Sequence, residues 1–200
     1  MQIKPIFPQA VLGLSKLEVD HNKVLKHIEN IEFIVTEASI QEEADVYISK
    51  NLNILDKIVY LRDEIYINVK NYLNNVMKLK IDFQFTTSWV TKTLPNGCSQ
   101  KHIHQNSFLS GVYYPIGNEG FNIKFYKEEY FWGVRATVNN DLNADWYNIN
   151  IAENSILILF PSNLRHSIEK NLSDKMRYSI AFNTLPLGEI GTGDSKINFK

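Results

Sequence analysis

Three of the five histidines are spaced in a way that suits the binding of a metal ion. His102 and His104 are separated by a single residue. Side chains alternate across an extended strand, so both imidazoles would point to the same face. His166 follows an apolar segment at 155–160 and a turn at 161–162, where another strand is expected to begin. A pair of histidines from one strand and a third from a distant strand can form a metal site with open coordination positions.

The segment 102–106 can supply the metal ligands in two ways, which we call the first and second registers. In the first register His102 and His104 bind the metal together with His166. In the second register His104 binds with Asn106 nearby, and His102 lies outside the ligand sphere. Neither register supplies the carboxylate of the common two-histidine, one-carboxylate iron site. We favour the first register, because two imidazoles on one face suit borderline metals better than an amide oxygen does.

A candidate carboxylate-binding residue follows the third histidine. Arg177 lies eleven residues after His166, in an alternating segment over 176–183. Alternation places Arg177, Ser179 and Ala181 on one face and the apolar side chains of the segment on the other. A buried guanidinium without a partner is very costly, so an inward-facing arginine indicates a bound anion. Arg177 can bind a carboxylate through two hydrogen bonds, and the hydroxyl of Ser179 can donate another.

The elements that must position these residues differ between the two halves of the chain. Residues 20–31 and 53–79 carry apolar side chains at helical spacing, and the second stretch predicts a long amphipathic helix. From about residue 82 the period changes to two, with aromatic and β-branched side chains. The pattern predicts helices packed outside a C-terminal β-barrel. Strands are predicted over 82–90, 107–115, 121–127, 130–138, 145–151, 155–160, 165–169 and 177–184.

The composition excludes several classes of protein. The formal net charge of -1 argues against a nucleic-acid-binding protein. No run of 18 apolar residues is present, so no membrane association is expected. Cys98 is the single cysteine, which rules out an internal disulfide and a thiolate zinc cluster. The N-terminal residues lack the apolar core and cleavage site of a signal peptide. We therefore expect a cytoplasmic protein.

The order of the motifs resembles a known family. The matching segments are HIH at 102–104, NS at 106–107, SGVYY at 110–114, LFPS at 159–162 and RYSIAFN at 177–183. In this order they look like the 2-oxoglutarate- and Fe(II)-dependent oxygenases common in marine bacteria and phages. The likeness covers residues 85–184 and extends to the opening IFP at 6–8.

The resemblance implies a mainly β fold with N-terminal helices: a double-stranded β-helix, the jelly roll of cupin type. It implies Fe(II) in the mouth of the barrel and 2-oxoglutarate held by Arg177 with Ser179, and Asn106 is a further candidate for the cofactor pocket. We interpret residues 1–200 as a single oxygenase-like domain. It would comprise a mostly helical support at 1–80, the β-helix core at 81–186 and a C-terminal tail at 187–200.

The expected function is a 2-oxoglutarate-dependent dioxygenase, a hydroxylase of a small molecule or a peptide that uses O2. The sequence does not identify the substrate or the oligomeric state. If the protein is encoded by a phage, the expected cytoplasm is that of the host. Two alternatives remain: a cupin-like metal-binding module, and a non-redox metalloenzyme with zinc or manganese on the histidines. Arg177 favours the oxygenase, because neither alternative requires a carboxylate-binding residue.

Overall fold

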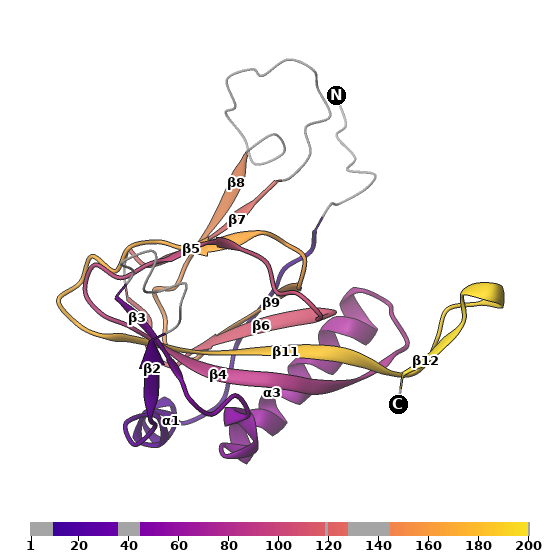
Figure 1. The fold of residues 1–200 in the computed structure, drawn as a ribbon, viewed down its shortest axis with the longest axis horizontal. Helices are drawn as coiled ribbons and strands as arrows, with labels where there is room; N and C mark the ends of the chain where they lie inside the picture. The colour runs from indigo at the N-terminus through magenta and orange to yellow at the C-terminus, as the bar shows by residue number, and fades with distance from the viewer. Residues whose placement is uncertain (1–9, 36–44, 119, 128–144, 200) are drawn as a thin grey trace.

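The computed structural model describes residues 10–35, 45–118, 120–127 and 145–199, which form two antiparallel sheets (Figure 1). The large sheet has the order β1 (Gly13–Lys16), β9 (Ile156–Pro161), β6 (Leu109–Tyr114), β11 (Arg177–Ile190), β4 (Asp82–Thr93), β3 (Val46–Ser49) and β2 (Phe33–Val35), and β12 (Ile197–Phe199) pairs with β11. The small sheet has the order β5 (Ser99–His102), β10 (His166–Ile168), β7 (Asn122–Tyr126) and β8 (Trp146–Asn150).

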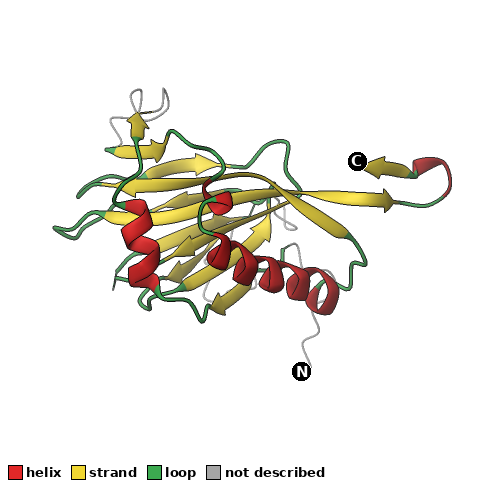
Figure 2. Cartoon of the chain, turned by 90° about the horizontal axis from the view of Figure 1, so that it is seen from below, coloured by secondary structure: helices red, strands yellow, loops and turns green. Residues whose placement is uncertain are grey.

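Each face of the large sheet buries a separate apolar cluster. On one face it packs against the helices α1 (His21–Ile28) and α3 (Val59–Asn71), which lie in front of the strands in Figure 2. On the other face it packs against the small sheet, through residues that include Val112, Phe160, Ile123 and Phe125. Two facing antiparallel sheets with helices on the outside confirm the jelly-roll class predicted from the sequence. The face between the sheets is the one that holds the candidate site.

The two predicted helices are found, but the second is shorter and less regular than its sequence pattern indicates. Asp20 caps α1, with its Oδ1 accepting from the backbone N–H groups of Asn22 and Lys23. The segment predicted as one helix over 53–79 divides into a 3-10 turn at Ile54–Asp56, α3, and a π turn at Tyr72–Val76. A tertiary contact stabilises the 3-10 turn that precedes α3, because the backbone N–H of Leu55 donates to Ser88 Oγ on β4. The apolar stripe itself is buried as predicted, from Ile54 through Leu61 to Leu73.

The predicted strands correspond to β4, β6, β7, β8, β9, β10 and β11, and the one predicted over 130–138 lies outside the described residues. The strand expected to carry both His102 and His104 is β5, which ends at His102. Among the described residues, four strands were not predicted from the sequence: β1, β2, β3 and β12. The first 80 residues therefore complete both edges of the large sheet as well as supplying helices. The segment predicted as a tail pairs with the end of β11 and projects from the body as a hairpin (Figure 2). Among the described residues, no helix has the length and apolar character needed to cross a membrane.

Candidate active site

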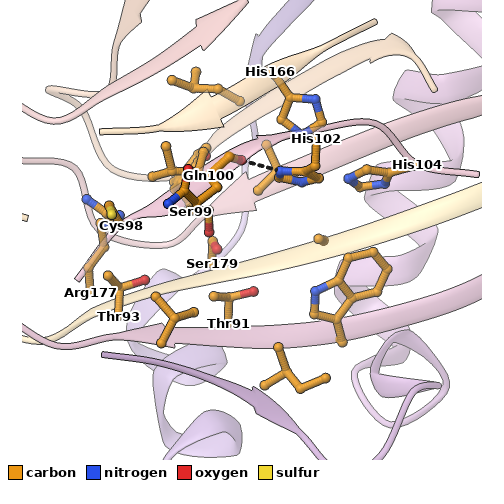
Figure 3. Close-up of a pocket in the computed structure, with 18 of the residues that line it drawn as sticks. Thr91, Thr93, Cys98, Ser99, Gln100, His102, His104, His166, Arg177 and Ser179 are labelled. Carbon is orange, nitrogen blue, oxygen red and sulfur yellow. Dashed lines mark hydrogen bonds between the residues drawn. The ribbon is translucent and has the colours of Figure 1, made fainter. Parts of the chain in front are cut away.

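A cavity of about 370 Å³ lies between the two sheets (Figure 3). β4, β6, β9 and β11 of the large sheet line one wall, and β5, β7 and β10 of the small sheet line the other. Within the described part of the chain, no aspartate or glutamate lines this cavity. Among these described residues the departure from the two-histidine, one-carboxylate pattern therefore holds in three dimensions, and the clustered candidate ligands are histidines.

The three histidines singled out in the sequence lie together at one end of the cavity. One potential ligand nitrogen from each of His102, His104 and His166 lies within 4.8 Å of the others. His102 and His166 are direct register partners across β5 and β10. His104 lies just beyond the end of β5, where its backbone N–H donates to the carbonyl oxygen of Ser162 over 2.9 Å. Strand pairing and this loop contact thus gather three imidazoles into one cluster.

The hydrogen bonds of the three rings leave the same nitrogen free on each. The Nδ1 of His102 lies 2.7 Å from the carbonyl oxygen of Gln100, and the Nδ1 of His166 lies 2.9 Å from that of Leu164. The Nδ1 of His104 lies 2.6 Å from Asn183 Oδ1. A carbonyl or amide oxygen accepts, so Nδ1 is the donor in each of these contacts, and the described residues form no hydrogen bond with Nε2 of these rings. Metal-binding histidines are commonly oriented by such a second hydrogen bond.

Burial keeps two of these rings in the neutral form. Desolvation lowers the pKa of His166 to about 3, and it also lowers the pKa of His104 below the usual value. The neighbouring histidines act in the same direction, because a second positive charge nearby disfavours protonation. Neutral imidazole is the form that binds a metal ion. The cluster is therefore ready to bind a divalent metal near neutral pH.

The other end of the cavity holds two buried polar groups without partners. Arg177 lies on β11, with its guanidinium carbon 3.4 Å from the ring centroid of Phe121. Among the described residues, neither Arg177 Nη1 nor the hydroxyl of Tyr114 has a hydrogen-bond partner. Burial lowers the pKa of Arg177 to about 10 and raises that of Tyr114. Unsatisfied buried donors are rare and costly, so this pair indicates a ligand, and a carboxylate matches both donors.

The alternation predicted for β11 agrees with its burial. Arg177, Ser179 and Ala181 line the cavity, whereas Ile180 and Phe182 pack in the cluster on the helix side. Asn106, the remaining sequence candidate, lies elsewhere. It is exposed, does not line the cavity, and has a left-handed backbone with φ of 54°.

Two polar residues in the site were given no role in the sequence analysis. Tyr114 reaches the cavity from β6, and Asn183 contacts His104 from β11. A signal for Asn183 was present, because it continues the alternation of Arg177, Ser179 and Ala181 by one more step. Tyr114 had no such signal, because it belongs to β6, a strand buried along its whole length.

Residues 87–183 match the family model described as "Putative 2OG-Fe(II) oxygenase". The chain belongs to the 2OG-Fe(II) oxygenase family. The match spans β4 to β11 and includes all three clustered histidines and Arg177. The enzyme class and the two cofactors implied by the sequence resemblance, Fe(II) and 2-oxoglutarate, are those of this family. No curated protein sequence matches this oxygenase.

Solved structures share the fold of this oxygenase at low sequence identity. A prolyl hydroxylase from Trichoplax adhaerens, in complex with a hypoxia inducible factor peptide fragment, is 15% identical with a TM-score of 0.62, covering 86% of this chain and 82% of that one. HygX from Streptomyces hygroscopicus, with nickel, 2-oxoglutarate and hygromycin B bound, is 8% identical with a TM-score of 0.61, covering 88% and 82%. A 2OG-Fe(II) family oxidoreductase from Burkholderia pseudomallei is 8% identical with a TM-score of 0.58, covering 82% and 76%. These likenesses confirm the double-stranded β-helix.

Proposed function

We propose that this oxygenase binds Fe(II) through the Nε2 atoms of His102, His104 and His166, and binds 2-oxoglutarate through Arg177 and Tyr114. One observation carries the proposal. A single cavity has three clustered imidazoles at one end and two buried donors without described partners at the other. A ligand with a metal-chelating end and a distal carboxylate matches both ends, and 2-oxoglutarate is such a ligand.

The residues of the chain bind, orient and shield the reactants. Bound iron supplies the activation of O2, coupled to conversion of 2-oxoglutarate into succinate and carbon dioxide and to oxidation of the substrate. Arg177 and Tyr114 fix the distal carboxylate, and Ser179, two residues further along the same face of β11, adds a hydroxyl to the cavity wall. Phe121 and Phe160 form apolar walls that exclude water around these charges. Exclusion of water strengthens each electrostatic contact in the cavity.

The substrate is proposed to be a small molecule or a peptide. Structural neighbours of both kinds support this range, since HygX holds hygromycin B and the Trichoplax prolyl hydroxylase holds a peptide fragment. Val46 and Ile48 of β3 line the same cavity and extend its apolar wall. The near-neutral charge of the chain supports a substrate other than nucleic acid, and its single cysteine supports action in a reducing cytoplasm.

The formation of succinate tests the proposed function. The purified protein is incubated in air with Fe(II), a reductant and 2-oxoglutarate, and succinate is measured against samples that lack iron or 2-oxoglutarate. We expect slow succinate formation that requires both additions, even without the substrate. If the metal-loaded protein neither forms succinate nor binds 2-oxoglutarate at millimolar concentration, the proposal is wrong.

Substitution of Tyr114 by phenylalanine is expected to weaken 2-oxoglutarate binding about tenfold. The change removes one buried donor to the carboxylate, and a hydrogen bond to a charged group contributes about 1.5 kcal/mol or more. Metal affinity should not change, because Tyr114 is not a ligand. The measurement is anaerobic calorimetry of the Mn(II)-loaded protein. Tyr113→Phe is the matched control, because the Tyr113 hydroxyl contacts Ser155 outside the cavity, and equal weakening in both variants would contradict the assignment.

Two alanine variants distinguish the two ligand registers. His102→Ala is expected to weaken Fe(II) or Co(II) binding at least tenfold, since it removes a ligand from the cluster. Asn106→Ala should leave the affinity unchanged, because Asn106 is exposed and outside the cavity. Anaerobic metal titration of both variants measures the difference. The reverse pattern, with a loss in Asn106→Ala alone, would establish the second register.

A further inference from the structure

His104 differs from the other two histidines in the group that holds its ring. Backbone carbonyl oxygens face the Nδ1 atoms of His102 and His166, and such an oxygen can only accept. The ring of His104 instead faces the side-chain amide of Asn183. An amide can present either an accepting oxygen or a donating nitrogen. Whether Nε2 of His104 is free for a metal therefore depends on which end of Asn183 faces it.

Hydroxyl groups of the two neighbouring strands contact both ends of the Asn183 amide, whose oxygen faces His104. Asn183 on β11 is the register partner of Thr87 on β4 and of Ser110 on β6. Its Nδ2 donates to Thr87 Oγ1 over 3.1 Å, and its Oδ1 accepts from Ser110 Oγ over 2.8 Å. Both ends of the amide are thus occupied by hydroxyl groups from the two flanking strands. The remaining capacity of Oδ1 is directed at Nδ1 of His104, 2.6 Å away.

A further serine connects this network to the backbone of His104. Ser162 Oγ lies 2.8 Å from Ser110 Oγ, and both serines are fully buried. The carbonyl oxygen of Ser162 accepts the backbone N–H of His104. Backbone and ring of His104 are therefore fixed by the same group of residues, although His104 lies outside any strand. Buried networks of this kind are rigid when each of their members is satisfied.

We infer that Asn183 is a positioning residue: it keeps His104 in the tautomer with the proton on Nδ1, so that Nε2 is free to bind a metal ion. If the amide nitrogen faced the ring, Nδ1 would accept and the proton would lie on Nε2, which removes the ligand. The identity of the bound metal rests on the proposed function. The tautomer of His104 is a property of the chain itself and can be measured without metal.

The test compares four proteins: the native chain, Asn183→Leu, Asn183→Asp and the control Asn148→Leu, at an exposed residue of β8. Nitrogen-15 NMR of the metal-free proteins reports the histidine tautomers. We expect Nδ1–H at His104 in the native chain, in the control and in Asn183→Asp, whose carboxylate only accepts. Asn183→Leu should show a mixture of tautomers. Co(II) titration should then show a 10- to 100-fold loss in Asn183→Leu, with Asn183→Asp within a few-fold of native.

The outcomes separate this inference from the proposed function. An Nε2–H tautomer at His104 in the native metal-free chain overturns the inference, and this result does not depend on whether any variant folds. Native-like Co(II) affinity in a folded Asn183→Leu also overturns it. If the tautomer follows Asn183 as expected but the native chain binds no metal, the proposed function fails and the positioning role stands. Loss of affinity in Asn183→Leu that Asn183→Asp fails to rescue counts against the tautomer mechanism.

Discussion

Replacement of His166 by alanine is expected to abolish Fe(II) binding. His166 is the most buried of the three histidines, with 3% of its surface exposed, and it lies at the start of β10 in register with His102. Its ring is 4.3 Å from that of His102 and 5.1 Å from that of His104, so its removal leaves two ligands on one side of the metal. No carboxylate among the described cavity residues can replace it.

Anaerobic titration with Fe(II) measures this effect. Thermal unfolding of the variant shows whether the fold survives the loss of a buried side chain. His21→Ala is the control, because His21 lies on α1 and does not line the cavity. A folded His166→Ala protein that binds Fe(II) with native affinity would show that the metal lies elsewhere.

Replacement of Arg177 by leucine is expected to weaken 2-oxoglutarate binding by roughly two orders of magnitude or more. A charge-assisted hydrogen bond contributes about 1.5–3 kcal/mol, and a two-point contact to a carboxylate includes two of them. Each 1.4 kcal/mol corresponds to about a tenfold change in affinity. Leucine keeps an apolar contact with Phe121, so the cavity wall should remain. Metal affinity should change little, because Arg177 lies at the far end of the cavity.

Calorimetry of the Mn(II)-loaded protein under anaerobic conditions measures this loss. Arg62→Leu is a suitable control, because Arg62 lies on the helix side of the large sheet and pairs with Asp56. If the native protein binds 2-oxoglutarate and Arg177→Leu binds it equally well, the co-substrate is correct and the carboxylate site is wrong.

The parts of the site that follow from local alternation could be predicted from the sequence. Arg177 and Ser179 share a face because successive residues of a strand point to opposite sides, and this requires no knowledge of the neighbouring strands. The helix over 21–28 was also predictable from local sequence, since Asp20 caps it and its apolar residues recur at helical spacing. The jelly-roll class followed from the number and spacing of the strands and from the family resemblance.

The parts that depend on tertiary contacts could not be predicted in the same way. Asn106 was a candidate because it follows His104 by two residues, but the chain turns there with a positive φ and directs Asn106 away from the cavity. Alternation places Asn183 on the same face as Arg177, but its contact with His104 depends on the register of three strands, which the sequence does not specify. The strands β1, β2 and β3 have only three or four residues each, which is too short for a periodic signal, and their place in the large sheet depends on pairing.

The central claim is that three histidines and Arg177 bind the two ends of one metal–2-oxoglutarate complex. A crystal structure of the protein with Mn(II) and 2-oxoglutarate, grown without oxygen, tests it most directly. The account predicts the metal at about 2.1 Å from Nε2 of His102, His104 and His166, and the distal carboxylate within hydrogen-bond distance of Arg177 and Tyr114. A metal more than about 3 Å from any of these three nitrogens, or a carboxylate away from Arg177, would contradict it.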